Sequence, residues 1–142
     1  MRADAPGQAR GLSRAPLRPR SRAAARFALA ALFAAAGVNH FAAPEPYVAI
    51  VPPALPWREA LVYISGAAEI AGALGILFRR TRRPAAAGLI ALLAAVFPAN
   101  IYAALHGMQL GGWHVPEWLL WARLPLQAVL IAWVYIACWR AD

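Results

Sequence analysis

The feature that most constrains this chain is the apolar segment Leu61–Phe78, which is long enough to cross a bilayer as a helix but carries an acid, Glu69, near its middle. A carboxylate at that depth costs about 2.5–3.5 kcal/mol on insertion scales unless it is paired or protonated. On a helix, small residues lie on one side of Glu69 and large apolar residues on the other. The small side allows another helix to approach closely, so we expect Glu69 to face protein rather than lipid.

Three further apolar segments of spanning length extend this prediction to the whole chain. Hydrophobic residues make up 62% of the 142 residues and charged residues 14%, against roughly 45–50% and 25% in soluble domains. The sequence therefore predicts an all-α fold, an antiparallel bundle of four transmembrane helices, as one domain over residues 23–140. The predicted spans are 23–42, 61–78, 84–105 and 118–139.

The arginines predict how the bundle is oriented. All 14 basic residues are Arg, and with four spans 12 of them lie on one side, in the N-terminal tail, the loop between the second and third spans, and the C-terminus. The opposite loops hold only Arg58, and Arg123 falls inside a span. The positive-inside rule then places both termini in the cytoplasm. This placement explains the net charge of +8 without a nucleic-acid partner, and none is expected.

The segments outside the spans carry fewer signals. Residues 1–22 are rich in Arg and Pro and are predicted to be a disordered cytoplasmic tail, although a secretory signal peptide is an alternative reading of the first apolar segment. Residues 43–60 contain five prolines, which exclude a continuous helix. That segment could be a lid over the end of the bundle or a simple interfacial connector. Residues 106–117 are predicted to be a loop, and Pro98 within the third span must free the carbonyl of Ala94.

Polar residues from all four spans are expected at one depth. At 1.5 Å per residue they lie roughly 5–14 Å inside the outer helix ends, in the outer half of a core about 30 Å thick. We expect Glu69 and Arg123 to form an ion pair there. Two interpretations stay open: hydrogen bonds that lock the helices together, or a ligand or redox-carrier site reached from outside. The candidate ligand-binding residues are Glu69, Arg123, Asn39, His40, Asn100 and Gln127.

Other chemistry finds less support in the sequence. His40 and His106 fall at outer helix ends and could ligate haem, but an interfacial histidine without a ligand is the commoner case, so haem is not favoured. Quinone carbonyls can accept hydrogen bonds from His or Arg, which makes a quinone the candidate cofactor. No metal site is predicted, because no HExxH-type spacing occurs. Cys138 is the single cysteine, so no internal disulfide or CxxC pair can form.

Four short motifs, in order, resemble those of DoxX-like membrane proteins. They are GVNHF at 37–41 followed by Pro44 and Pro46-Tyr47, SGAAE at 65–69, FPANIY at 97–102, and RLPLQ at 123–127. The resemblance covers about residues 23–138 and implies a small multi-pass four-helix bundle in the bacterial plasma membrane. Some members of that family are redox-associated, as quinone-linked thiosulfate oxidation subunits or as partners of redox-defence proteins.

These observations lead to one main functional hypothesis. It is a membrane redox-associated subunit that binds a quinone or another small apolar carrier near the polar layer and acts with a redox partner protein. The alternatives are a small-solute transporter or channel-like protein, and a structural or assembly partner without activity of its own. The lipid bilayer is an expected partner, and a homo-oligomer is left open. No catalytic residue is assigned, so whether the protein is an enzyme stays undecided.

Overall fold

The computed structural model describes residues 19–139, so the predicted tail over residues 1–18 and the C-terminal residues 140–142 lie outside the described part. The all-α prediction is confirmed for the described residues, to which the structure adds a two-stranded antiparallel hairpin. The first helix begins at Pro19, inside the segment predicted to be tail. The elements are α1 (Pro19–Ala42), α2 (Glu45–Ile50), α3 (Arg58–Gly75), α4 (Arg82–His106), β1 (Gln109–Leu110), β2 (Trp113–His114) and α5 (Glu117–Cys138).

Three of the helices are long and apolar enough to cross a membrane: α1 from Arg20, α4 and α5. The helix α3 is not among them, because its eighteen residues include Arg58, Glu59 and Glu69. It also begins and ends earlier than the predicted span. Its C-terminal end is fixed by the loop that follows, where the Thr81 hydroxyl donates a hydrogen bond to the Gly75 carbonyl at 2.8 Å. This bond satisfies one of the carbonyls that a helix end leaves without a partner.

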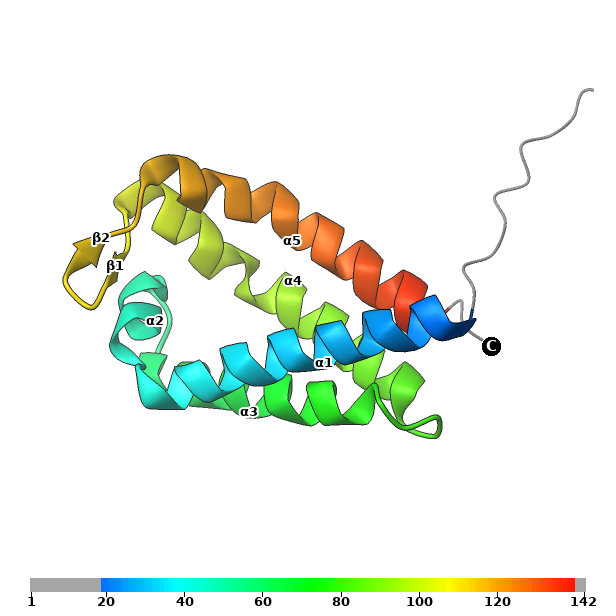
Figure 1. Ribbon diagram of the computed structural model, residues 1–142. Coiled ribbons are helices and arrows are strands. Elements are labelled where there is room, and N and C mark those ends of the chain that lie inside the picture. Colours follow the sequence, from blue (N-terminus) through cyan, green and yellow to red (C-terminus); the bar gives the residue numbers. More distant parts are fainter. Residues whose placement is uncertain (1–18, 140–142) are drawn as a thin grey trace, which may run out of the picture.

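The four long helices are arranged as two antiparallel pairs, α1 with α3 and α4 with α5 (Figure 1). Glycines bring α1 and α3 into backbone contact: a Cβ atom added to Gly37 would lie 2.6 Å from the carbonyl oxygen of Gly66, and one added to Gly66 would lie 2.9 Å from that of Gly37. Such close approach is typical of helix pairs in membranes, where small residues replace the hydrophobic effect as the basis of packing.

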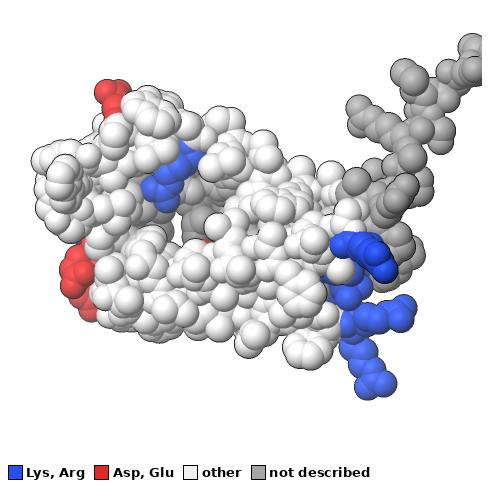
Figure 2. Space-filling view, in the orientation of Figure 1, with Lys and Arg blue, Asp and Glu red and all other residues white. Residues whose placement is uncertain are grey.

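The two pairs meet at the end of the molecule where α1 begins. A buried apolar cluster joins all four long helices there, and the Arg26 guanidinium of α1 donates to the Ala137 carbonyl of α5 at 3.3 Å. Basic side chains gather at this end, and acidic side chains lie at the opposite end (Figure 2). The members of this inner cluster are Leu29, Ala30, Phe33, Ala73, Ile76, Ala86, Leu89, Leu93, Val134, Ala137 and Cys138.

Toward the other end, which we call the outer end, the two pairs separate and the short helix α2 lies between them (Figure 1). A second apolar cluster forms where α2 meets α4 and α5, and it contains Ile50, Ala103, Ala104, Met108 and Leu120. The prediction that prolines prevent a continuous helix over residues 43–60 is confirmed, since α2 ends at Ile50 and Val51 is extended before Pro52. Between the pairs, the face shown in Figure 2 is hollowed, and a basic side chain borders the hollow.

Candidate functional site

The first polar group of the outer half lies between α1 and α3, where His40 faces Glu69. The Nδ1 atom of His40 is 3.5 Å from Oε2 of Glu69 and 3.1 Å from Oγ of Ser65. Helical side chains lean toward the N-terminus of their helix. Because α1 and α3 are antiparallel, His40 leans inward and Glu69 leans outward, so the two side chains meet. The Gly37–Gly66 contact makes this meeting possible, since Gly37 lies against the Cβ atom of Glu69.

The hydrogen bonds of Ser65 fit a proton on Nδ1 of His40. The Ser65 hydroxyl donates its proton to the Val62 carbonyl at 2.8 Å, so its oxygen is left to accept from Nδ1–H of His40. The neutral imidazole then has Nε2 as its acceptor. Glu69 remains poorly satisfied: its side chain is only 15% exposed, and among the described residues no group donates a hydrogen bond to its buried Oε2.

Tyr47 of α2 completes this group, and sequence reasoning did not select it. Its hydroxyl accepts a hydrogen bond from the Asn39 amide at 2.6 Å, and its ring meets the His40 ring edge-on at a centroid distance of 4.1 Å. Its hydroxyl proton is still available for donation, because the bond to Asn39 uses only an acceptor position. The signal for Tyr47 was its place in the Pro46-Tyr47 pair that follows the GVNHF motif, on the proline-rich segment for which a lid and a connector are both open.

The second polar group lies between α4 and α5 and is well satisfied. Asn100 donates through Nδ2 to Oε1 of Gln127 at 2.7 Å, and Nε2 of Gln127 in turn donates to the carbonyl of Leu93. The sequence predicted a free carbonyl near Pro98, on Ala94, and the amide of Gln127 reaches the carbonyl one residue earlier. A proline in a helix disturbs the turn that precedes it, so a side-chain donor from the neighbouring helix compensates this kind of break.

The expected ion pair between Glu69 and Arg123 is wrong for this structure. Glu69 has His40 within ion-pair distance, and Nη1 of Arg123 donates instead to the sulfur of Met108 at 3.3 Å. The physical reason is the arrangement of the helices: α3 packs on α1 and α4, while α5 packs on α4 and α1. The two charged residues therefore belong to helices at opposite corners of the bundle.

The remaining histidines make separate local contacts. The ring of His106 stacks on Tyr102 with centroids 4.0 Å apart, and Nδ1 of His106 is 3.0 Å from the Tyr102 carbonyl oxygen. His114 in β2 contacts the Gln109 amide across the hairpin at 3.1 Å. His40 and His106 are thus not brought together as a pair. Within residues 19–139, no three His, Cys, Asp or Glu side chains are grouped as a metal site would require.

Three helices of the bundle have the length and hydropathy needed to cross a membrane, which is typical of a small helical membrane protein. The family can also be stated. The model of a family described as a domain of unknown function, DUF8561, matches residues 29–138, and the chain belongs to that family. The match runs from within α1 to the end of α5, so it includes every candidate ligand-binding residue. No curated protein and no solved structure matches the chain. The resemblance to DoxX-like proteins therefore rests on the four motifs alone.

Proposed function

We propose that this protein is a four-span membrane protein that binds a quinone, or another small apolar carrier with carbonyl and hydroxyl groups, in the hollow of its outer half. In this proposal it serves as a redox-associated subunit in the bacterial plasma membrane, as the DoxX-like motifs suggest. The hollow lies between two groups of polar side chains. The Asn100 and Gln127 amides have hydrogen-bond partners, whereas Glu69 and Arg123 lack strong ones. This difference is the observation that carries the proposal.

The fourth span in this proposal is α3. Two of its three charges, Arg58 and Glu59, lie in its first turn at the outer end, where charged side chains can reach the interface. Only Glu69 lies deeper, and it faces α1 rather than lipid. The basic residues at the opposite end support a cytoplasmic location for that end.

Structural hydrogen bonding alone would leave all buried polar groups satisfied. The Asn100–Gln127 group meets that expectation, since both amides have partners. Glu69 and Arg123 do not. Oε2 of Glu69 is buried without a donor, and the acceptor of Arg123 among the described residues is a thioether, which is a weak one. These two groups lack strong partners and belong to the two helix pairs that border the hollow, and a ligand that reaches the partly exposed Glu69 carboxylate and the Arg123 guanidinium would supply a partner to each.

A quinone and its reduced form have the required chemistry. A carbonyl oxygen can accept from the Arg123 guanidinium, and a hydroxyl can donate to the Glu69 carboxylate. Tyr47 has a proton free to donate to either form. Hydrogen bonds to charged groups contribute about 1.5–3 kcal/mol each, so removing one should weaken binding about 10- to 100-fold.

The inner half of the bundle argues against transport through it. The inner apolar cluster closes the space between the helix pairs with fully buried side chains such as Leu29, Ile76 and Val134. The hollow therefore ends blind within the described part of the chain. A blind site suits a bound carrier better than a pathway for solutes.

The test is quinone binding by purified protein in nanodiscs, with a short-tailed benzoquinone as probe and quenching of tryptophan fluorescence as readout. Glu69→Gln and Arg123→Gln should each weaken binding about 10-fold or more. Glu59→Gln and Arg80→Gln are matched controls, because the same charges are removed from exposed positions outside the hollow. Wild-type protein that neither binds the probe nor co-purifies with a quinone would refute the proposal. So would Arg123→Gln protein that is folded and binds like wild type.

A further inference from the structure

We propose that the ligand enters the hollow sideways from the outer leaflet, through the gap between α1 and α5, and leaves its hydrocarbon tail in that gap. The substrate class is then a membrane-borne amphiphile with a small neutral head group and an isoprenoid or alkyl tail. This inference rests on the binding site proposed above and specifies which molecules reach it and by which route.

The route from the aqueous side is obstructed by α2. Ile50 at the end of α2 is 5% exposed and packs in the outer apolar cluster against α4 and α5. Arg58 holds the same helix from the other side, since its Nη2 donates to the Val48 carbonyl at 2.8 Å. The helix α2 is thus attached to both helix pairs and lies between them at the outer end (Figure 1). A ligand coming from water would have to displace it.

The side between α1 and α5 is open by contrast. These two helices meet at the inner end, where Arg26 bonds to the Ala137 carbonyl. Farther out, α1 turns toward α3 through the Gly37–Gly66 contact, and the outer apolar cluster contains no residue of α1. Figure 2 shows the resulting hollow on this face of the molecule. At this depth the neighbouring medium of a four-span bundle is the hydrocarbon of the outer leaflet.

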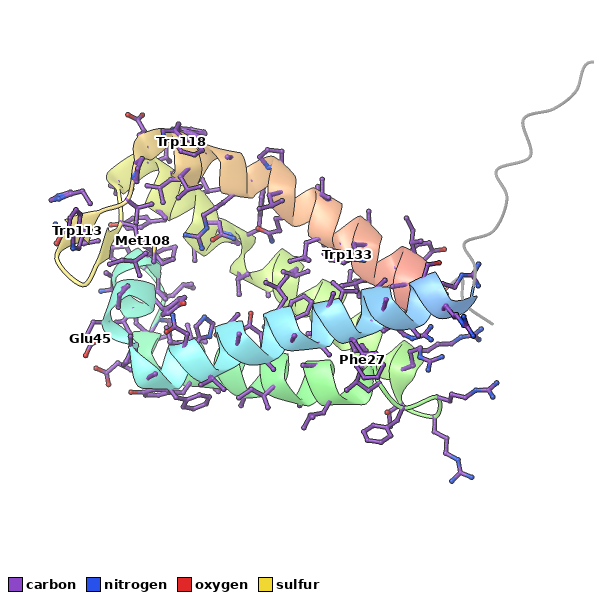
Figure 3. The ribbon with its side chains drawn as sticks, viewed as in Figure 1. Phe27, Glu45, Met108, Trp113, Trp118 and Trp133 are labelled. Atoms are coloured by element: carbon purple, nitrogen blue, oxygen red, sulfur yellow. The ribbon has the colours of Figure 1, made fainter. Side chains whose placement is uncertain are left out.

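Along α5, the side chains that border the gap change from polar to apolar. Leu126, Leu130 and Trp133 follow Arg123 at spacings of three, seven and ten residues, which place them along the same side of the helix. Leu126 is 60% and Trp133 38% exposed, and Figure 3 shows Trp133 on the side of α5 that faces α1. This apolar strip is about 15 Å long at 1.5 Å per residue. It begins at the guanidinium and runs toward the closed inner end, as the tail of a ligand with its head at Arg123 would.

The charges on the two walls select a neutral head group. Arg123 alone would attract a phosphate, but the Glu69 carboxylate belongs to the opposite helix pair and would repel it. In the proposed four-span arrangement, the hollow would also lie below the level of phospholipid phosphates, which remain at the headgroup surface. A quinone-type ring carries hydrogen-bonding oxygens without net charge and can approach both residues.

The test compares two probes in phosphatidylcholine nanodiscs: a tail-less dimethoxy-benzoquinone and the same head group with a decyl tail. Leu126→Trp enlarges an exposed side chain at the gap, and Ile64→Trp makes the same change on α3 at a position that is 64% exposed. Leu126→Trp should slow association of the decyl probe about tenfold and leave the tail-less probe unaffected. Ile64→Trp should leave both rates unchanged. Equal rates for the decyl probe in both variants would overturn the lateral route.

A second measurement locates the tail directly. A decyl probe with a diazirine at the end of its tail, activated by light and followed by peptide mass spectrometry, should label α5 between Leu126 and Trp133 and the facing side of α1. Labels on α2 or the β1–β2 hairpin would overturn the inference, and so would displacement of the probe by phosphatidylglycerol. If the tail-less probe does not bind wild-type protein at all, it is the proposed site that fails, and the two failures can be told apart.

Discussion

Gly37→Ala is the substitution for which the structure makes the sharpest prediction. The new Cβ atom would lie 2.6 Å from the Gly66 carbonyl oxygen, 2.8 Å from a side-chain carbon of Ile70 and 3.1 Å from the Cβ atom of Glu69. The nearest of these atoms is backbone, so the contact cannot be relieved by a rotamer change. The helices α1 and α3 would have to move apart, and His40 would be drawn away from Glu69.

The size of the effect follows from two opposing terms. Overpacking of this kind costs typically about 1–3 kcal/mol, and replacing a mid-helix glycine by alanine returns about 0.5–1 kcal/mol through backbone entropy. Gly88→Ala provides the gain in backbone entropy without the cost of overpacking, because no atom lies within 4 Å of the position of its Cβ. The difference in unfolding free energy between the two variants therefore isolates the cost of separating α1 from α3, about 1–3 kcal/mol.

The assay is reversible unfolding in mixed micelles, followed by tryptophan fluorescence, with both variants and the wild type under the same conditions. Gly88→Ala should be as stable as wild type or more stable, and Gly37→Ala less stable than Gly88→Ala. Quinone affinity of the folded Gly37→Ala protein should also fall, because His40 and Glu69 move apart. If the two alanine variants have equal stability, α1 and α3 are not in backbone contact and the site built on that contact is incorrect.

Two further predictions concern the hydrogen bonds of the outer half. Gln127→Leu should lower the unfolding free energy by about 1–3 kcal/mol, since it leaves the Asn100 amide and the Leu93 carbonyl without their partner; adding Asn100→Leu should cost little more, and a fully additive double variant would contradict the coupling. Arg58→Met should speed amide hydrogen exchange in α2 by releasing the Val48 carbonyl, with little change in global stability, and unchanged exchange there would show that α2 is held by other contacts.

The sequence was a good guide to the helices because their signals are local. The lengths of the apolar segments and the proline-rich stretch over residues 43–60 predicted four long helices, and their observed ends differ from the predicted ones by a few residues. The largest differences have side-chain causes. At the end of α3, the Thr81 hydroxyl caps the helix by donating a hydrogen bond to the Gly75 carbonyl, and the periodicity of the sequence does not signal such a bond. The number of spans stays a prediction, because α3 carries three charges.

The site was predicted less well. The depth of a residue can be counted along its own helix, whereas a contact between two side chains depends on how two helices pack. Counting residues from helix ends grouped Glu69 with Arg123, but only the order of the helices around the bundle decides which side chains meet. That order depends on close approach at Gly37 and Gly66. The sequence indicated a face of small residues beside Glu69, but it did not single out Gly37 or show which helix would occupy that face. The pairing of Asn100 with Gln127, on helices that are sequence neighbours, was within reach and is present.

The separation of Glu69 from Arg123 strengthens the case for a ligand more than the expected ion pair would have. A direct pair could be explained by stability alone, since each charge would compensate the other. In this structure an acid and a guanidinium lie in the outer half of one small bundle, each with a weak partner, His40 at 3.5 Å and the sulfur of Met108. Holding both charges apart costs free energy that apolar residues at these positions would not incur. A neutral molecule that bridges the two walls would recover that free energy, and its binding should therefore stabilise the wild-type protein more than the Glu69→Gln/Arg123→Gln double variant.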